Sequence, residues 1–174
     1  SNNLPTTGYN NQSIMYFIRG LVPNADLDWF RDYWAPGQEN MVQTRPFSSL
    51  LDNPYLIAHE MLNKVNRNNV IGNITASYQF TKELSLMART TLDWASEARS
   101  QQRPMSSQKF ASGMYRTQNI FTQELNYDFL LNYNKVFRKN FVLNASFGGS
   151  RMHNKYISDE MRAEKLLYPG AYNF

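Results

Sequence analysis

Two stretches of regular alternation between apolar and polar side chains constrain the fold of this chain more than any other feature. In residues 70–80 and 84–94, aliphatic and aromatic side chains take most alternate positions, with Asn, Ser, Thr and Gln between them. The same pattern returns in residues 125–135 and 141–151. A period of two residues is typical of β-strands. The sequence therefore predicts an all-β fold with four antiparallel strands.

The connectors between these strands differ sharply in length. Residues 81–83 and a turn centred on Arg138-Lys139-Asn140 close two hairpins, whereas residues 95–124 form a long loop between the hairpins. Long irregular stretches flank the set, residues 1–69 before it and residues 152–174 after it. Short turns at one end, long extracellular loops at the other and strands of about 10 residues are typical of transmembrane β-barrels of the bacterial outer membrane.

A soluble sandwich is the alternative, because its strands also alternate and periodicity does not show which face is inside. The polar face is rich in Asn, Ser, Thr and Gln rather than Lys and Glu, and aromatic residues cluster near the strand ends. Both observations favour a barrel in which Ile74, Leu86, Phe129 and Leu143 face lipid. The longest apolar run, residues 14–18, is far shorter than the roughly 18 residues of a membrane-spanning helix.

Composition and motifs argue against several other classes of protein. Aromatic residues make up 14% and charged residues 18% of the chain, which excludes intrinsic disorder. The net charge of +4 comes from scattered cations, so we expect a solvated surface and no nucleic-acid partner. The chain has no Cys, which excludes a disulfide framework and thiolate metal sites. No secretory signal precedes the pattern, so we expect a mature product or an internal piece of a longer protein.

No motif indicates an enzyme. His59 and Glu60 begin a zinc-binding HExxH motif, but the second histidine is missing. No phosphate loop, dinucleotide fingerprint or nucleophile elbow is present. We therefore expect no catalytic residue, no metal and no cofactor.

An aromatic segment in the first long loop is a candidate contact surface. Residues 25–34 predict a short helix, with Asn24 as its N-cap and Pro36-Gly37 as its end. Its aromatic side chains suit stacking on sugar rings or anchoring a protein partner. The alternative is a loop folded on its own small core. The aromatic candidates are Trp29, Phe30, Tyr33 and Trp34.

Charged residues on the polar strand faces are the second candidate. Arg89, Asp93 and Asp128 alternate with apolar positions, so they face the lumen of the predicted barrel. An isolated cation facing lipid at mid-depth would cost about 2–4 kcal/mol. These side chains either contact a hydrated ligand or pair with one another.

Six segments, in the expected order, resemble the SusC/RagA family of TonB-dependent outer-membrane transporters. They are Asn53-Pro54-Tyr55, residues 66–73, residues 78–86, Leu92-Asp93-Trp94, residues 124–135 and residues 168–173. The resemblance implies a 22-stranded barrel with a plugged lumen, of which this chain is a fragment. Residues 70–151 supply two hairpins, residues 1–69 a long extracellular loop region, and residues 152–174 the start of the next loop.

The resemblance also implies a function and partners. The protein would import oligosaccharides or peptides across the bacterial outer membrane, together with a SusD-like surface lipoprotein. Outer-membrane lipid and the remaining barrel strands would surround this chain, and TonB would bind a segment absent from it. The alternatives are a passive small outer-membrane barrel, a surface-ligand-binding or adhesion protein, and a soluble extracellular binding module.

Overall fold

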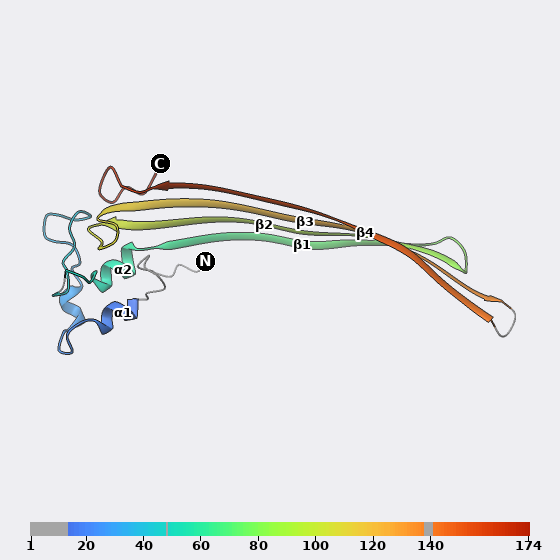
Figure 1. The fold of residues 1–174 in the computed structure, drawn as a ribbon, viewed down its shortest axis with the longest axis horizontal. Helices are drawn as coiled ribbons and strands as arrows, with labels where there is room; N and C mark the ends of the chain where they lie inside the picture. The colour runs from blue at the N-terminus through green and yellow to red at the C-terminus, as the bar shows by residue number, and fades with distance from the viewer. Residues whose placement is uncertain (1–13, 48, 138–140) are drawn as a thin grey trace. The chain divides into compact units, whose positions relative to one another are not determined.

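The computed structural model describes residues 14–47, 49–137 and 141–174, and its main element is a four-stranded sheet (Figure 1). The strands are β1 (Asn63–Gln79), β2 (Leu84–Met105), β3 (Ser112–Phe137) and β4 (Phe141–Ala163). They lie in chain order, and the sheet is antiparallel. The all-β prediction is confirmed at this level. The predicted turn at Arg138-Lys139-Asn140 lies outside the described residues.

All four strands are longer than predicted, and the prediction of a long loop over residues 95–124 is wrong. Strand β2 continues to Met105 and β3 begins at Ser112, so only residues 106–111 connect them. Likewise, β1 begins at Asn63 within the predicted first loop, and β4 runs to Ala163 within the predicted last one. These extensions are largely polar on both faces. Backbone pairing continues through them although the apolar alternation stops.

The β2–β3 connection is a hairpin loop that its own side chains stabilise. The Ser106 amide donates to the Ala111 carbonyl oxygen at 2.9 Å. The Ser107 hydroxyl accepts from the Phe110 amide at 3.1 Å and lies 3.2 Å from the Phe110 carbonyl oxygen. Ser106 adopts a left-handed conformation with φ of 69°. The loop therefore begins at a strained residue held by local hydrogen bonds.

The chain divides into two compact units, and each strand contributes to both. One unit, the loop unit, comprises the described residues up to 66, residues 98–119 and residues 159–174. The other, the sheet unit, comprises residues 67–97 and the described part of residues 120–158. No helix in the described part of the chain is both long enough and apolar enough to span a bilayer.

The loop unit has a small hydrophobic core of its own. Helices α1 (Ile14–Arg19) and α2 (Pro54–Glu60) pack together, burying Phe17, Leu56 and Ile57. Asn53 begins α2: its side chain accepts from the Tyr55 amide at 2.9 Å, and Pro54 follows in the first turn. An Asn N-cap followed by Pro at the first helical position is a strong start signal for a helix.

The helix predicted over residues 25–34 is shorter than expected. The structure has one turn of 3-10 helix, η1 (Leu27–Phe30), and its N-cap is Asp26 rather than Asn24. The Asp26 carboxylate accepts from the Asp28 amide at 3.0 Å. The helix ends at Phe30, well before Pro36-Gly37. Helices α1 and α2 were not predicted.

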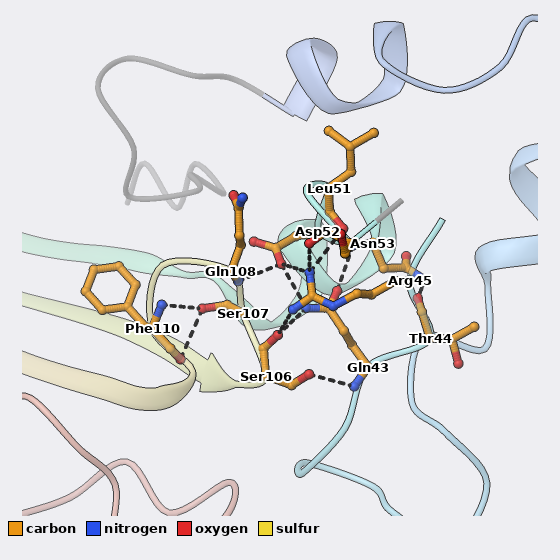
Figure 2. A network of polar contacts seen from close by, with 11 residues as sticks. Gln43, Thr44, Arg45, Leu51, Asp52, Asn53, Ser106, Ser107, Gln108 and Phe110 are labelled. Atoms are coloured by element: carbon orange, nitrogen blue, oxygen red, sulfur yellow. Dashed lines mark hydrogen bonds and ion pairs between the residues drawn. The ribbon is translucent and has the colours of Figure 1, made fainter. Parts of the chain in front are cut away.

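A buried polar network joins the loop before α2 to the β2–β3 hairpin loop (Figure 2). The Asp52 carboxylate oxygen Oδ1 accepts from the Gln43 side-chain amide and from the Gln108 backbone amide, each at 2.8 Å. Arg45 lies 3.5 Å from the same oxygen and donates to the Ser106 carbonyl oxygen at 2.7 Å. Asp52 is fully buried. We call these five residues the Asp52 network.

Asn53 extends this anchoring to the aromatic segment. Its side-chain amide donates to the carbonyl oxygens of Phe30 at 3.0 Å and Thr44 at 2.9 Å. Its backbone amide donates to the Gln43 side chain at 2.8 Å. One buried asparagine thus caps α2 and fixes two other loop segments, so the loop unit is ordered by polar contacts as well as by its core.

Candidate functional site: the polar sheet face

Within the sheet unit, the strand faces separate as the alternation predicts. On one face, the rings of Phe129 and Phe147 lie 5.8 Å apart between β3 and β4. On the opposite face, the Ser146 hydroxyl donates to the Asn132 side-chain oxygen at 2.8 Å across the same two strands. We call these the apolar face and the polar face. The polar face carries two of the three charged candidates as a direct pair.

That pair is Arg89 on β2 and Asp128 on β3. The Arg89 guanidinium donates to the Asp128 carboxylate through Nε at 3.0 Å and lies within 2.9 Å through Nη2. Both side chains retain contact with solvent, so their net contribution to stability is small, about 1 kcal/mol or less. The mutual pairing that the sequence left open is therefore present, and it neutralises both charges.

Asp93 lies apart from this pair, in a hollow of about 320 Å³ on the polar face. The side chains that alternate onto this face come from all four strands: Arg67, Asp93, Ala95, Thr122, Glu124, Asn154 and Tyr156. The Glu124 carboxylate accepts from the Asn126 side chain at 2.8 Å. This mixture of amide, hydroxyl, carboxylate and guanidinium groups can hydrogen-bond a hydrated solute. We call it the Asp93 hollow.

The loop unit contains a second polar hollow, of about 170 Å³. Asn63, Arg99, Gln101, Arg116 and Gln118 contribute polar side chains to it. Arg116 donates to the Glu160 carboxylate at 2.6 Å, and this hydrogen bond is the main cause that holds the pKa of Glu160 below its ordinary value. We call this second hollow the Arg116 hollow.

A buried arginine, Arg103, lies near the end of β2, within the loop unit. Arg103 is fully inaccessible and donates to the Asn63 side-chain oxygen at 3.1 Å and to the Gln102 carbonyl oxygen at 2.6 Å. Burial lowers the pKa of Arg103 to about 10, whereas neighbouring Tyr172 acts in the opposite direction. Burial also raises the pKa of Tyr172. Arg103 is therefore still charged at neutral pH.

The aromatic candidates do not form one surface patch. Phe30 is buried and packs against Phe47, with ring centroids 5.6 Å apart. Tyr33 and Trp34 pack against the core of α1 and α2. Trp29 is 58% exposed and contacts Phe47 edge-on at 6.2 Å. For three of the four residues, the loop folded on its own core describes the structure, and Trp29 alone presents most of its ring to solvent.

Tyr33 also makes a polar contact with α2. Its hydroxyl donates to the Glu60 carboxylate at 3.0 Å, and its ring stacks on His59 at 5.9 Å. Burial, followed by the contact with Glu60, raises the pKa of Tyr33. His59 stacks on Tyr55 as well, at 6.3 Å. Both residues of the truncated HExxH motif are thus engaged with tyrosines.

Sequence reasoning missed the Asp52 network, Arg103 and the polar residues of the Arg116 hollow. Asn53-Pro54 was a usable signal for α2 and hence for the position of the neighbouring Asp52. No group of three or more His, Cys, Asp or Glu side chains in the described ranges is arranged to hold a metal ion. What the polar faces offer chemically is reversible hydrogen bonding and charge pairing.

No family model matches the sequence, and a search of curated proteins finds no match either.

Proposed function

We propose that this chain forms part of the wall of a TonB-dependent outer-membrane transporter of the SusC/RagA kind. The apolar face of the sheet unit contacts lipid, and the polar face lines the lumen. The transporter imports oligosaccharides or peptides with a SusD-like lipoprotein at its extracellular opening. TonB and the remaining strands act through parts of the protein outside this chain.

The observation that carries this proposal is the exposure of the apolar face. Ile74 is 78% exposed, Phe147 68%, Phe129 44% and Leu143 38%, whereas a soluble sandwich would bury such residues in its core. An apolar face of this kind requires an apolar environment. The lipid of an outer membrane supplies it, and the alternating polar face then borders water.

Aromatic rings gather at both limits of the apolar face, as they do in the interfacial girdles of outer-membrane barrels. Near the short turns, Tyr78 contacts Phe80 at 4.9 Å and Phe137 contacts Phe141 at 6.0 Å. At the other limit, Trp94 contacts Phe121 at 6.1 Å. Two such groups of aromatic rings at the limits of an apolar band are what the two interfaces of a bilayer favour.

The outer edges of β1 and β4 support a larger assembly. Among the described residues, neither edge has a neighbouring strand. Unpaired backbone groups in lipid cost several kcal/mol each, and closed barrels need about eight strands or more. Further strands must therefore pair with both edges if the sheet lies in a membrane.

Single-cysteine labelling tests the orientation cleanly, because the chain has no Cys of its own. Ala145→Cys and Ile74→Cys lie on the apolar face, and their neighbours Asn144→Cys and Thr75→Cys are matched controls on the polar face. In intact cells, we expect a charged, water-soluble maleimide to label the polar-face pair and to spare the apolar-face pair. Detergent-free labelling of all four at equal rates contradicts the proposal and favours a soluble module.

Energy coupling separates the transporter from the passive barrel and the adhesion protein. Uptake of a panel of labelled oligosaccharides and short peptides should stop when the proton gradient is collapsed. Uptake that continues without the gradient indicates a passive barrel. Surface binding without any uptake indicates an adhesion protein.

The loop unit allows a test of partner contact at the extracellular side. Trp29→Ala removes an exposed ring, so we expect stability to change by less than about 0.5 kcal/mol while lipoprotein association weakens. Trp34→Ala truncates a side chain packed on the core, so we expect a loss of about 2 kcal/mol of local stability. Unchanged lipoprotein binding and unchanged uptake in Trp29→Ala would refute the contact.

A further inference from the structure

A stripe of basic side chains begins where the apolar band of β4 ends. The apolar face of β4 carries Phe141, Leu143, Ala145 and Phe147, and the following alternate positions after Gly149 are Arg151, His153 and Lys155. The Lys155 ammonium group lies over the Phe121 ring at 5.9 Å, and Phe121 contacts Trp94 at 6.1 Å. The stripe therefore adjoins the aromatic row that limits the apolar face.

The same face has a hollow of about 360 Å³ next to this stripe. Its lining consists of three consecutive triplets, one from each of β2, β3 and β4, centred on Arg89, Asp128 and Ser150. By the strand alternation, the outer members of each triplet project onto the apolar face and the side chains of the central members onto the polar face. The polar-face neighbours of the central residues do not line the hollow. It consequently opens on the apolar face.

Small side chains create the hollow and aromatic rings border it. Ala88 and Thr90 leave space that Tyr127 and Phe129 flank. A Cβ atom at Gly149 would lie 2.9 Å from Phe129 Cε1, so the ring lies directly against the glycine backbone. The volume falls within the range of about 300–1,000 Å³ typical of ligand pockets.

Arg151 lines this hollow and is also the first member of the basic stripe. Among the described residues, Arg151 and Lys155 form no ion pair with a carboxylate. A guanidinium group binds phosphate oxygens with two parallel hydrogen bonds, and a lysine adds a point charge. An apolar hollow that leads to unpaired cations is complementary to an amphiphile with an anionic head.

We propose that this surface binds a phosphorylated membrane lipid, with an acyl chain in the hollow and the phosphate at Arg151, His153 and Lys155. The proposal rests on the proposed membrane orientation and adds a specific lipid to it. The bound lipid would fix the depth of the sheet in the bilayer, since its headgroup marks the level of the interface.

Native mass spectrometry of the whole protein in dodecyl maltoside tests the proposal. The probes are dioleoyl phosphatidylglycerol, dioleoylglycerol as the chain without phosphate, and inorganic phosphate. We expect Arg151→Gln and Lys155→Gln each to weaken phosphatidylglycerol binding about fivefold, the effect of one basic side chain at an anionic surface. Dioleoylglycerol binding should not change in either variant. Lys82→Gln, in the β1–β2 turn, is the charge-matched control and should leave both affinities unchanged.

A second variant tests the acyl chain separately. Ala88→Leu fills the hollow with an exposed, apolar side chain, so it should weaken phosphatidylglycerol and dioleoylglycerol by the same factor. Displacement of phosphatidylglycerol by inorganic phosphate alone would show an anion site and overturn the lipid proposal. An equal loss in Lys82→Gln would show that only net charge matters, which overturns it as well.

The cysteine labelling described above separates failure of this proposal from failure of the proposed function. If the water-soluble maleimide labels Ala145→Cys in intact cells, the membrane orientation itself is wrong. If Ala145→Cys is protected but Arg151→Gln and Ala88→Leu bind phosphatidylglycerol normally, the lipid site alone is wrong.

Discussion

Replacing Asp52 with alanine should release the loops that the Asp52 network joins. The carboxylate accepts two hydrogen bonds of 2.8 Å and lies 3.5 Å from Arg45. A hydrogen bond to a charged group is worth about 1.5–3 kcal/mol. The Gln43 side-chain amide keeps its second acceptor, the Ser106 carbonyl oxygen at 2.5 Å, so part of the hydrogen-bonding energy of Gln43 is retained. We expect a net loss of about 3–4 kcal/mol in local unfolding free energy, within the range for a broken buried charge pair.

Amide hydrogen exchange, followed by mass spectrometry, measures this loss directly. A loss of about 3 kcal/mol corresponds to somewhat more than a hundredfold faster exchange, since each 1.4 kcal/mol is a factor of ten. The acceleration should appear in peptides covering residues 41–53 and residues 106–111, because the network joins these segments. Peptides from residues 70–80 should exchange at an unchanged rate.

Asp28→Ala is the matched control, because it removes another aspartate from the same unit. Both side chains of its ion pair with Arg31 are largely exposed, at 70% and 67%, so its loss should barely change the exchange rates. If Asp52→Ala accelerates neither segment, the network does not hold the loops. If Asp28→Ala has an equal effect, the buried position of Asp52 is not the cause.

Two further changes test contacts in the loop unit. Arg116→Gln should raise the pKa of Glu160 toward 4.5, because the 2.6 Å hydrogen bond depresses it; carboxyl NMR titration measures this. Since the pKa of Glu160 is depressed in the folded protein, the stabilisation that its hydrogen bond with Arg116 gives the fold is present above pH 4.5 and disappears as the pH falls through the folded pKa. A Glu160 titration that Arg116→Gln leaves unchanged would contradict this cause. Gly113→Ala should cost about 2 kcal/mol or more, because Gly113 has φ of +73° and the new Cβ would lie 2.5 Å from Leu166 Cδ1. Gly72→Ala, with no atom within 4 Å of its Cβ, is the control in thermal unfolding, and equal midpoints for both variants would refute the clash.

The sequence predicted the sheet where both faces carried information. In residues 70–80 and 141–151, apolar side chains alternate with polar ones. The short polar segment at residues 81–83 then indicates the hairpin turn. It failed for residues 95–105 and 112–124, because polar residues occupy most positions on both faces there. Backbone hydrogen bonds can extend a strand even where the side chains on its two faces do not differ in polarity. The alternation of side chains therefore does not reveal the strand pairing in these segments.

The contacts of the candidate site were predictable only where the interacting residues lie on neighbouring strands and follow the alternation of faces. Opposite charges on the same face of neighbouring strands pair readily, which is why pairing of Arg89 and Asp128 was foreseeable. The Asp52 network has no periodicity, since Gln43 and Ser106 are 63 positions apart. Single polar residues in loops show nothing in the sequence about which distant backbone group they meet. The aromatic segment was misjudged for the same reason, because packing against Phe47 and against the core of α1 and α2 determines which rings are exposed.

The sequence separation within the Asp52 network sets an order of events during folding. The β1–β2 turn closes over a few residues, as the Phe80 amide meets the Leu84 carbonyl oxygen at 2.9 Å. Asp52, by contrast, accepts a hydrogen bond from the backbone amide of Gln108, which is 56 positions later in the chain. Loops that close over such distances form slowly, because their closure entropy must be overcome first. We therefore expect the contact between Asp52 and Gln108 to form later in folding than local contacts of the same loop, such as the hydrogen bond between Gln43 and Asp52, nine positions apart.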